Sequence, residues 1–378
     1  MHIPAYAARQ SGLSLVELMV GMLVGLIGII IISHLYVTNE QYKRSTTGAG
    51  AAQVNGAIAL YTVERDLRMA GYGINNTNAL GCTCNTGIDP NCSPLQYYFN
   101  GTYSSPPAGP GSPLRTLQVA PVVIVKTPNQ PDSITLLYGS DNERSTPTRL
   151  LQTMSPPAYD FIADGSGGFD NNAMVVVTQG ASCALAQITV GGDNSQLLHP
   201  AGTYNPANNG SLPIFARDAS VFNLGITPIW RTYTIANDKL VATEVLPPQG
   251  GAGGQQLVDD IVDMQALYGK DTSVVVGGDR NVDVYDGVTP NTADGWQRVL
   301  AVRIAVLARS QNYEKPNAAG VCQATTSALT VPPGNAPIWS GGAFPALEAA
   351  LATPGNEAGC YKYRVFETVV PLRNMIWR

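Results

Sequence analysis

The chain has 378 residues, a net charge of −5 and only 13% charged residues, with 39 glycines and 27 prolines. This length accommodates one large domain, or two modest ones with an appended element. The many turn-forming residues favour short strands over a helical enzyme. No run or stripe of Lys and Arg follows Arg44, so a basic nucleic-acid-binding surface is not expected.

A short polar leader precedes a long apolar segment. Met1–Gly12 carries one fixed charge, and Leu13–Leu35 is an apolar run of 23 residues, long enough to cross a bilayer as a helix. A cleaved secretory signal does not fit, because its apolar region has roughly 7–15 residues and ends at a small-x-small site. Ser33-His34-Leu35 offers no such site. We therefore expect a membrane-spanning helix, within which Gly21, Gly25 and Gly28 would allow close helix packing.

Glu17 is the one acidic residue in this run, and its surroundings resemble a processing signal. Residues 10–20, QSGLSLVELMV, are similar to the class III signal of type IV prepilins. In that family a prepilin peptidase cuts after the glycine and methylates the new amino terminus, and the fifth mature residue is a glutamate. The resemblance implies cleavage between Gly12 and Leu13, with Glu17 fifth from the new terminus. The family often has Phe where this chain has Leu13.

The position of Glu17 also has a physical interpretation. A carboxylate at the centre of a membrane helix costs about 2.5–3.5 kcal/mol on insertion scales, and less near the interface. In a core of packed helices the carboxylate needs a cationic partner. The free α-amino group of a neighbouring subunit's Leu13 would supply it and would set the axial stagger between subunits. The alternative is that Glu17 reaches the headgroup region and serves no assembly role.

The helix is predicted to continue beyond the membrane. No proline occurs between Pro4 and Pro90, and apolar residues recur at helical spacing, namely Val54, Ala57, Ile58, Leu60, Tyr61 and Leu67. Gly71-Tyr72-Gly73 predicts the stop. A helix over residues 13–70 would be about 87 Å long, half in the membrane and half packed on the domain. Gly48, Gly50 and Gly56 predict either a bend or a crowded packing face.

After Tyr72 the sequence predicts strands separated by loops rich in Gly, Pro, Asn and Ser. The expected strands are Leu117–Lys126, Ser133–Tyr138, Met174–Thr178, Leu185–Val190, Val221–Ile226, Ile229–Ile235, Lys239–Leu246, Val262–Tyr268, Val299–Ala308 and Tyr361–Leu372. The expected loops are Ser104–Pro113, Gly165–Asn172, Gly191–Pro213, Pro247–Gln255 and Pro332–Ala343. The predicted fold class is α+β. It has a leader (1–12), a helix (13–70) and an antiparallel β-rich domain (71–378) with an insertion at about 80–255.

Three segments near the C-terminus indicate which group of type IV pilin-like proteins the chain resembles. Met264–Asp271, Trp296–Ser310 and Arg364–Asn374 resemble the PilW-like minor pilins. Independently of that resemblance, the second and third segments are predicted to be strands that close a sheet over the helix. The middle of the chain, residues 80–255, resembles no family that we identify.

All six cysteines follow the apolar segment: Cys82, Cys84, Cys92, Cys183, Cys322 and Cys360. An even number in an exported chain predicts disulfides, and six cysteines allow 15 connectivities. A Cys322–Cys360 pair fits adjacent strands. Cys82 and Cys84 are too close in sequence for an easy mutual bond, so Cys92 and Cys183 are their expected partners. The rival interpretation, a zinc cluster, lacks a C-x-x-C motif and has one histidine outside the membrane region, His199.

Residues 278–287 place oxygen-bearing side chains at alternate positions, at Asp279, Asn281, Asp283 and Asp286. This pattern resembles the opening of a calcium loop but lacks the later glycine and glutamate of an EF-hand. The alternative is a solvated turn, and we assign no metal or cofactor. The sequence contains none of the short motifs that are typical of hydrolases and of phosphate-binding loops. A catalytic site that uses histidine would depend on His199 alone. We therefore predict no catalytic residues.

The combined expectation is a minor pilin that serves pilus biogenesis, adhesion and twitching motility. It would be processed by prepilin peptidase, inserted once in the inner membrane with a periplasmic domain, and assembled near the tip of an extracellular pilus. Its partners would be other minor pilins, the major pilin and a tip adhesin. The nearest alternative is a minor pseudopilin of type II secretion. An alternative of another class is a membrane-anchored periplasmic enzyme or binding module.

Overall fold

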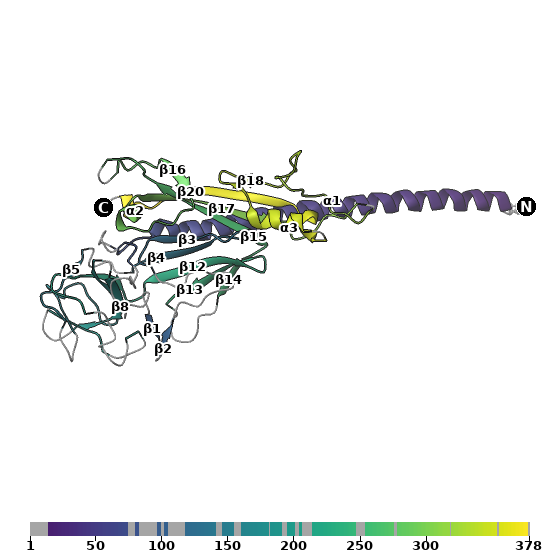
Figure 1. Ribbon diagram of the computed structural model, residues 1–378. Helices are drawn as coiled ribbons and strands as arrows, with labels where there is room; N and C mark the ends of the chain where they lie inside the picture. Colours follow the sequence, from purple (N-terminus) through teal and green to yellow (C-terminus); the bar gives the residue numbers. More distant parts are fainter. Residues whose placement is uncertain are drawn as a thin grey trace, which may run out of the picture.

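A computed structural model shows a long helix that leaves a β-rich body at one end (Figure 1). The structure describes residues 14–74, 80–82, 97–99, 102–104, 118–140, 146–154, 160–180, 182–190, 195–200, 204–205, 214–246, 254–275, 278–317, 319–353 and 355–376. The α+β class predicted from the sequence is confirmed, since one long helix precedes several antiparallel sheets.

Helix α1 (Leu15–Met69) is continuous over 55 residues. Ser14 caps its first turn, and Gly71 and Gly73 follow its end with φ of +82° each. Such backbone angles favour glycine, because other residues meet a Cβ clash there. The helix therefore stops where the sequence predicted, and it continues unbroken through Gly48, Gly50 and Gly56.

Two sheets and the second half of α1 form a framework. The four-stranded sheet has the order β16-β15-β17-β20 and the five-stranded sheet the order β14-β13-β12-β4-β3, with antiparallel pairing throughout. The first comprises β15 (Ile261–Lys270), β16 (Val284–Asp286), β17 (Val299–Arg309) and β20 (Tyr363–Pro371). The second comprises β3 (Val122–Val125), β4 (Ser133–Tyr138), β12 (Ile229–Ala236), β13 (Lys239–Glu244) and β14 (Gln255–Asp259). One shared apolar core joins α1 to both sheets.

A C-terminal segment covers the face of the four-stranded sheet that is turned away from α1. Ala305 and Leu307 of β17 pack there against Phe344 and Leu347. The segment contains β18 (Ile338–Trp339), β19 (Gly342–Ala343), α3 (Pro345–Ala352) and the 3-10 helix η3 (Glu357–Cys360). Short helices α2 (Ala293–Gln297) and α4 (Arg373–Ile376) flank β17 and β20 in sequence.

A separate lobe lies to one side of the framework, at the end opposite the N-terminus (Figure 1). It has a four-stranded sheet in the order β5-β11-β7-β8 and a three-stranded sheet in the order β6-β10-β9. Its strands are β5 (Thr148–Arg149), β6 (Phe161–Ile162), β7 (Met174–Gln179), β8 (Ser182–Gln187), β9 (Thr189–Val190), β10 (Gln196–Leu198) and β11 (Ser220–Gly225). A short hairpin of β1 (Tyr97–Phe99) and β2 (Thr102–Ser104) precedes it in sequence.

Most expected strands are present, and two of the expected loops contain short strands. Leu185–Val190 is divided between β8 and β9 by Ile188, and the strand expected from residue 117 begins at Val122. The expected loop Gly191–Pro213 contains β10, and Pro332–Ala343 contains β18 and β19. Strand β14 was missed because its residues, QQLVD, are mostly polar. Edge strands like β14 need little apolar pattern, since their exposed face is solvated.

Candidate functional site

The first half of α1 is the candidate site for membrane insertion and assembly. Among the described residues it is the one helix apolar and long enough to cross a membrane, with a mean hydropathy of 2.7 over its best window. The side chains from Leu15 to Val37 are exposed in the single chain apart from Gly28. An apolar surface of this extent needs lipid or other helices around it.

Glu17 lies in the first turn of α1 and is exposed. Its backbone N–H donates to the Ser14 hydroxyl at 3.2 Å and to the Ser14 carbonyl at 3.1 Å. Ser14 and Glu17 thus have the spacing of a capping box, and a carboxylate in the first turn is favoured by the helix dipole. The sequence interpretation overlooked the cap, although the S-x-x-E pattern signals it. Gly12 and Leu13 lie outside the described residues.

The second half of α1 faces the sheets through small residues. Ala52, Ala59 and Val63 are buried, and Gly56 lies against the ring of Phe366 on β20. Gly48 is also close to the domain, since a Cβ built there would be 3.4 Å from Cβ of Ser310. The glycines at 48 and 56 are therefore part of a packing face. Gly50 has open space around its Cα.

The prediction of which apolar residues of the second half of α1 face the domain is wrong in part. Val54, Ile58 and Tyr61 are exposed, with Tyr61 64% accessible, whereas Leu67 is fully buried as expected. The reason is steric. The sheet approaches α1 most closely along its smallest residues, so the large side chains at 54, 58 and 61 point away from the domain. They form a second apolar stripe on the outer surface of the helix.

A buried ion pair locks the end of α1 to the five-stranded sheet. The Asp66 carboxylate accepts hydrogen bonds from Arg231 Nη1 and from the Tyr233 hydroxyl, each at 2.7 Å, and its side chain is 2% exposed. Burial, together with the negative charge of Asp66, raises the pKa of Tyr138 to about 12. The sequence interpretation did not place Asp66 on the buried face of the helix. Its place between Val63 and Leu67, on the buried face, was the available signal.

Three of the acidic side chains around residues 271–286 come together. Carboxylate oxygens of Asp271, Asp279 and Asp283 lie within 4.8 Å of one another. Asp286 instead pairs with Lys270 at 2.6 Å. The carboxylates accept hydrogen bonds from their own loop. Asp283 accepts from the Thr272 N–H at 2.7 Å, and Asp279 accepts from the Asn281 N–H at 2.9 Å.

Asp271 is the buried member of this acidic group. Burial alone would raise its pKa, but hydrogen bonds from Ser273 and from the Arg280 N–H outweigh burial and hold the pKa of the Asp271 carboxyl below its ordinary value. The carboxylates therefore serve as hydrogen-bond acceptors in a tight polar turn.

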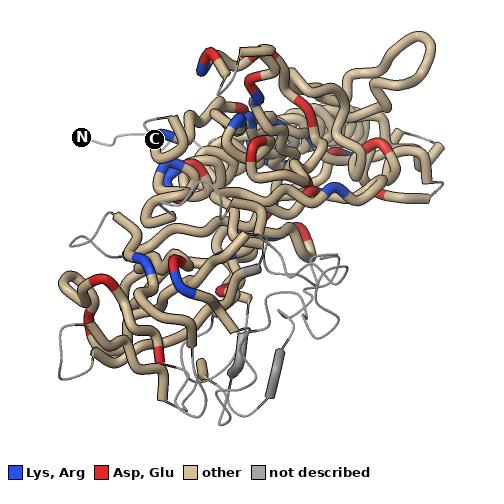
Figure 2. Tube along the Cα trace, turned by 60° about the vertical axis from the view of Figure 1, so that its left-hand side comes forward, with Lys and Arg blue, Asp and Glu red and all other residues tan. Residues whose placement is uncertain are grey.

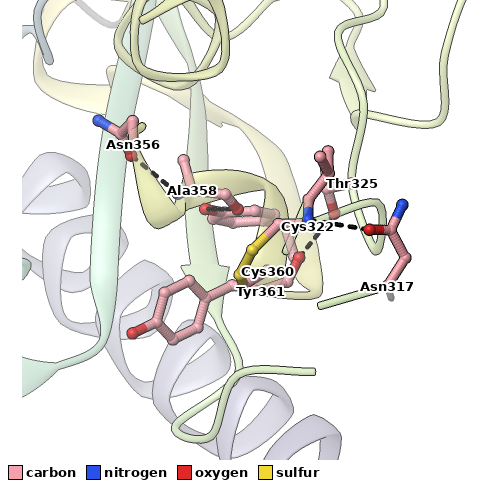
Figure 3. Close-up of a disulfide and its surroundings, with 9 residues drawn as sticks. Asn317, Cys322, Thr325, Asn356, Ala358, Cys360 and Tyr361 are labelled. Carbon is pink, nitrogen blue, oxygen red and sulfur yellow. Dashed lines mark hydrogen bonds between the residues drawn. A yellow bond between two sulfur atoms is a disulfide. The ribbon is translucent and has the colours of Figure 1, made fainter. Parts of the chain in front are cut away.

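Disulfides connect parts of the chain that are distant in sequence. Cys322 is bonded to Cys360, the pair that the sequence favoured. The bond joins the loop that contains Cys322 to η3 (Figure 3). Cys82 is bonded to Cys183 with a Cα–Cα distance of 6.1 Å, one of the two partners expected for it. Cys84 and Cys92 lie outside the described residues.

His199, on which a histidine-based reaction would depend, is buried in the lobe. Its ring lies 4.5 Å from the ring of Phe161, and its side chain is enclosed by the core. Charged residues of both signs are sparse along the described trace (Figure 2).

Residues 231–374 match the family model described as Type IV Pilus-assembly protein W. No curated protein and no solved structure matches the chain. The matched segment runs from β12 into α4, so it includes the whole four-stranded sheet β16-β15-β17-β20. The match confirms the resemblance that the sequence suggested in these residues. The chain is similar to the type IV pilus-assembly protein W family, and this similarity implies involvement in type IV pilus assembly.

Proposed function

We propose that the protein is a minor pilin, cleaved after Gly12, methylated at Leu13 and assembled near the tip of a type IV pilus. One observation carries the proposal. The first half of α1 is apolar and exposed, and the second half of the same helix packs against the sheet that lies within the family match. The apolar half suits a bilayer before assembly and a bundle of helices afterwards, because both surround it with apolar groups. The role is structural, without catalysis.

Glu17 would act as the alignment residue. In a helix bundle its carboxylate is shielded from water, and the free amino group at a neighbouring Leu13 would neutralise it. The exposed stripe of Val54, Ile58 and Tyr61 supports the same arrangement, since it offers the outer face of α1 to adjacent subunits. Other minor pilins and the major pilin are the proposed partners along this helix, and a tip adhesin is the proposed partner of the domain.

The domain would face the periplasm before assembly and the exterior afterwards. A periplasmic or extracellular location is consistent with the Cys82–Cys183 and Cys322–Cys360 bonds, which persist in oxidising compartments. The large β-rich body favours a minor subunit, because a major pilin repeats many times in tight packing.

The test combines location with processing. Filaments sheared from wild-type cells should contain the protein, and filaments from a deletion strain should be fewer or absent. Mass spectrometry should find N-methylated Leu13 as its terminus, and Gly12→Ala should leave the precursor in the membrane. A mature protein that retains Met1, or that never enters filaments, would refute the proposal. Recovery with a secretion complex instead would identify a pseudopilin.

A further inference from the structure

The chain passes from the framework to the lobe and back again between two neighbouring strand ends. Strands β4 and β12 are neighbours in the five-stranded sheet, and their register pairs Tyr138 with Ile229. Directly opposed residues of antiparallel strands have Cα atoms about 4.5–5.5 Å apart, a gap that a two-residue turn closes in an ordinary hairpin. Residues 139–228 therefore occupy the place of a short hairpin loop.

The inserted segment has its own apolar core. Phe161 and Leu197 of the three-stranded sheet pack with Val175, Val177 and Val221 of the four-stranded sheet, and all five are buried. This cluster is distinct from the core that joins α1 to the framework sheets. A layer of sheet on each side of one apolar cluster is the minimum arrangement for a domain.

The inserted segment is also firmly docked. The opposite face of its four-stranded sheet, with Val176 and Phe222, belongs to the framework core. The Cys82–Cys183 bond links β8 to the segment after α1, and the Gly139 N–H donates to the Tyr72 carbonyl at 2.7 Å. Tyr72 lies just beyond the end of α1. The segment is therefore held at the end of the helix remote from its membrane-spanning half.

The family match does not include the inserted segment. It begins at residue 231, three residues after the insertion ends, and covers the framework from β12 onward, while α1, β3 and β4 of the framework also precede it. From these observations we propose that residues 139–228 are an accessory module, inserted into a hairpin of a framework that assembles without it. The module's role then lies outside subunit packing. The assembly part of this inference rests on the proposed function.

The test compares the same substitution in the two cores of the full chain. Leu197 in the module and Leu67 on α1 are both fully buried. Leu197→Ala should raise the rate of proteolytic cleavage within residues 139–228 by at least about tenfold, leave the framework as a resistant fragment, and preserve incorporation into sheared filaments. Leu67→Ala should lower incorporation, because it loosens the contact between α1 and the sheets.

A second variant tests the hairpin directly. Replacing residues 139–228 with Asn-Gly, together with Cys82→Ser to avoid an unpaired thiol, should give a chain that still enters filaments. If this variant does not fold, the Leu197→Ala comparison decides alone. Loss of intact Leu197→Ala protein from filaments, or cleavage of module and framework in one cooperative step, would overturn the inference. Absence of the wild-type chain from filaments would refute the proposed function, while the cleavage pattern would still decide whether the module is separate.

Discussion

Gly56 of α1 lies directly against the ring of Phe366 on β20, so close that a Cβ built on Gly56 would overlap the ring. Glycine in a helix is destabilising by roughly 0.5–1 kcal/mol relative to alanine, and here its absent side chain lets the helix meet the sheet. The contact joins α1 to β20, the last strand of the family-matched segment.

Gly56→Ala should therefore destabilise the protein by about 1–3 kcal/mol, the usual range for overpacking. Gly50→Ala is the matched control, because nothing lies within 4 Å of its Cβ position. It should be neutral or stabilising by up to about 1 kcal/mol, from helix propensity alone. Denaturant unfolding of the detergent-solubilised chain measures both, and equal effects would show that the ring does not constrain Gly56.

Asp66→Asn should destabilise the protein by about 3–5 kcal/mol, because it removes the charge of a buried carboxylate that pairs with the partly buried guanidinium of Arg231. Arg231 keeps Glu244 as a second partner, so the lower end of this range is expected. Glu64→Gln is the control, since the pair with Arg68 has a 55% exposed arginine and surface pairs contribute about 0–1 kcal/mol. Thermal unfolding checks the difference, and similar losses in both variants would contradict the proposed lock.

Asp263 should make stability depend on pH. Burial raises the pKa of its carboxyl to about 6, against about 3.9 for an exposed aspartate. The folded chain thus holds this proton more tightly, so the contribution is fully present below about pH 4 and is lost as pH rises to about 6. This loss amounts to about 3 kcal/mol.

Asp263→Asn should remove that component, so that the wild-type minus variant difference in unfolding free energy falls between pH 4 and pH 7. Asp164→Asn is the matched control, because it makes the same substitution at a carboxylate that is 57% exposed. Urea titrations at several pH values provide the measurement. A pH-independent difference for Asp263→Asn would mean that its carboxyl titrates in the ordinary range.

Glu17→Ala should be cleaved and inserted normally yet fail to enter filaments. Removing the carboxylate leaves a neighbour's ammonium uncompensated in an apolar core, at about 3–5 kcal/mol, enough to disfavour docking a few hundred-fold or more. Glu40→Ala is the control, since Glu40 pairs with the exposed Arg44 at 3.1 Å. Immunoblots of membranes and sheared filaments compare them. Normal incorporation of Glu17→Ala would show that the carboxylate has no assembly role.

Thiol alkylation without reductant should leave Cys322, Cys360, Cys82 and Cys183 unmodified. The Cys322–Cys360 bond has a sequence separation of 38, and closing such a loop stabilises by roughly 3–4 kcal/mol in the chain-entropy model. The double variant Cys322→Ser, Cys360→Ser should unfold at lower denaturant by a corresponding amount. Alkylation of either cysteine in the oxidised wild type would exclude this pairing.

The sequence alone determined the helix and the strands that depend on the pattern of neighbouring residues. The apolar run, its stop at Gly71 and the strongly apolar strands such as β17 were predictable, because helix ends and buried strands depend on short-range pattern. The resemblance in residues 264–271, 296–310 and 364–374 also came from short contiguous runs, and the family match bears it out.

Tertiary structure decided which side of each element is buried. Val54, Ile58 and Tyr61 have the helical spacing of a core face but are exposed, whereas Asp66 is charged but buried with Arg231. Likewise, only the pairing of Tyr138 with Ile229 shows that residues 139–228 are one insertion. The physical reason is that burial depends on which distant surfaces approach. Small residues such as Gly56 permit that approach, and spacing along one segment carries no information about the partner.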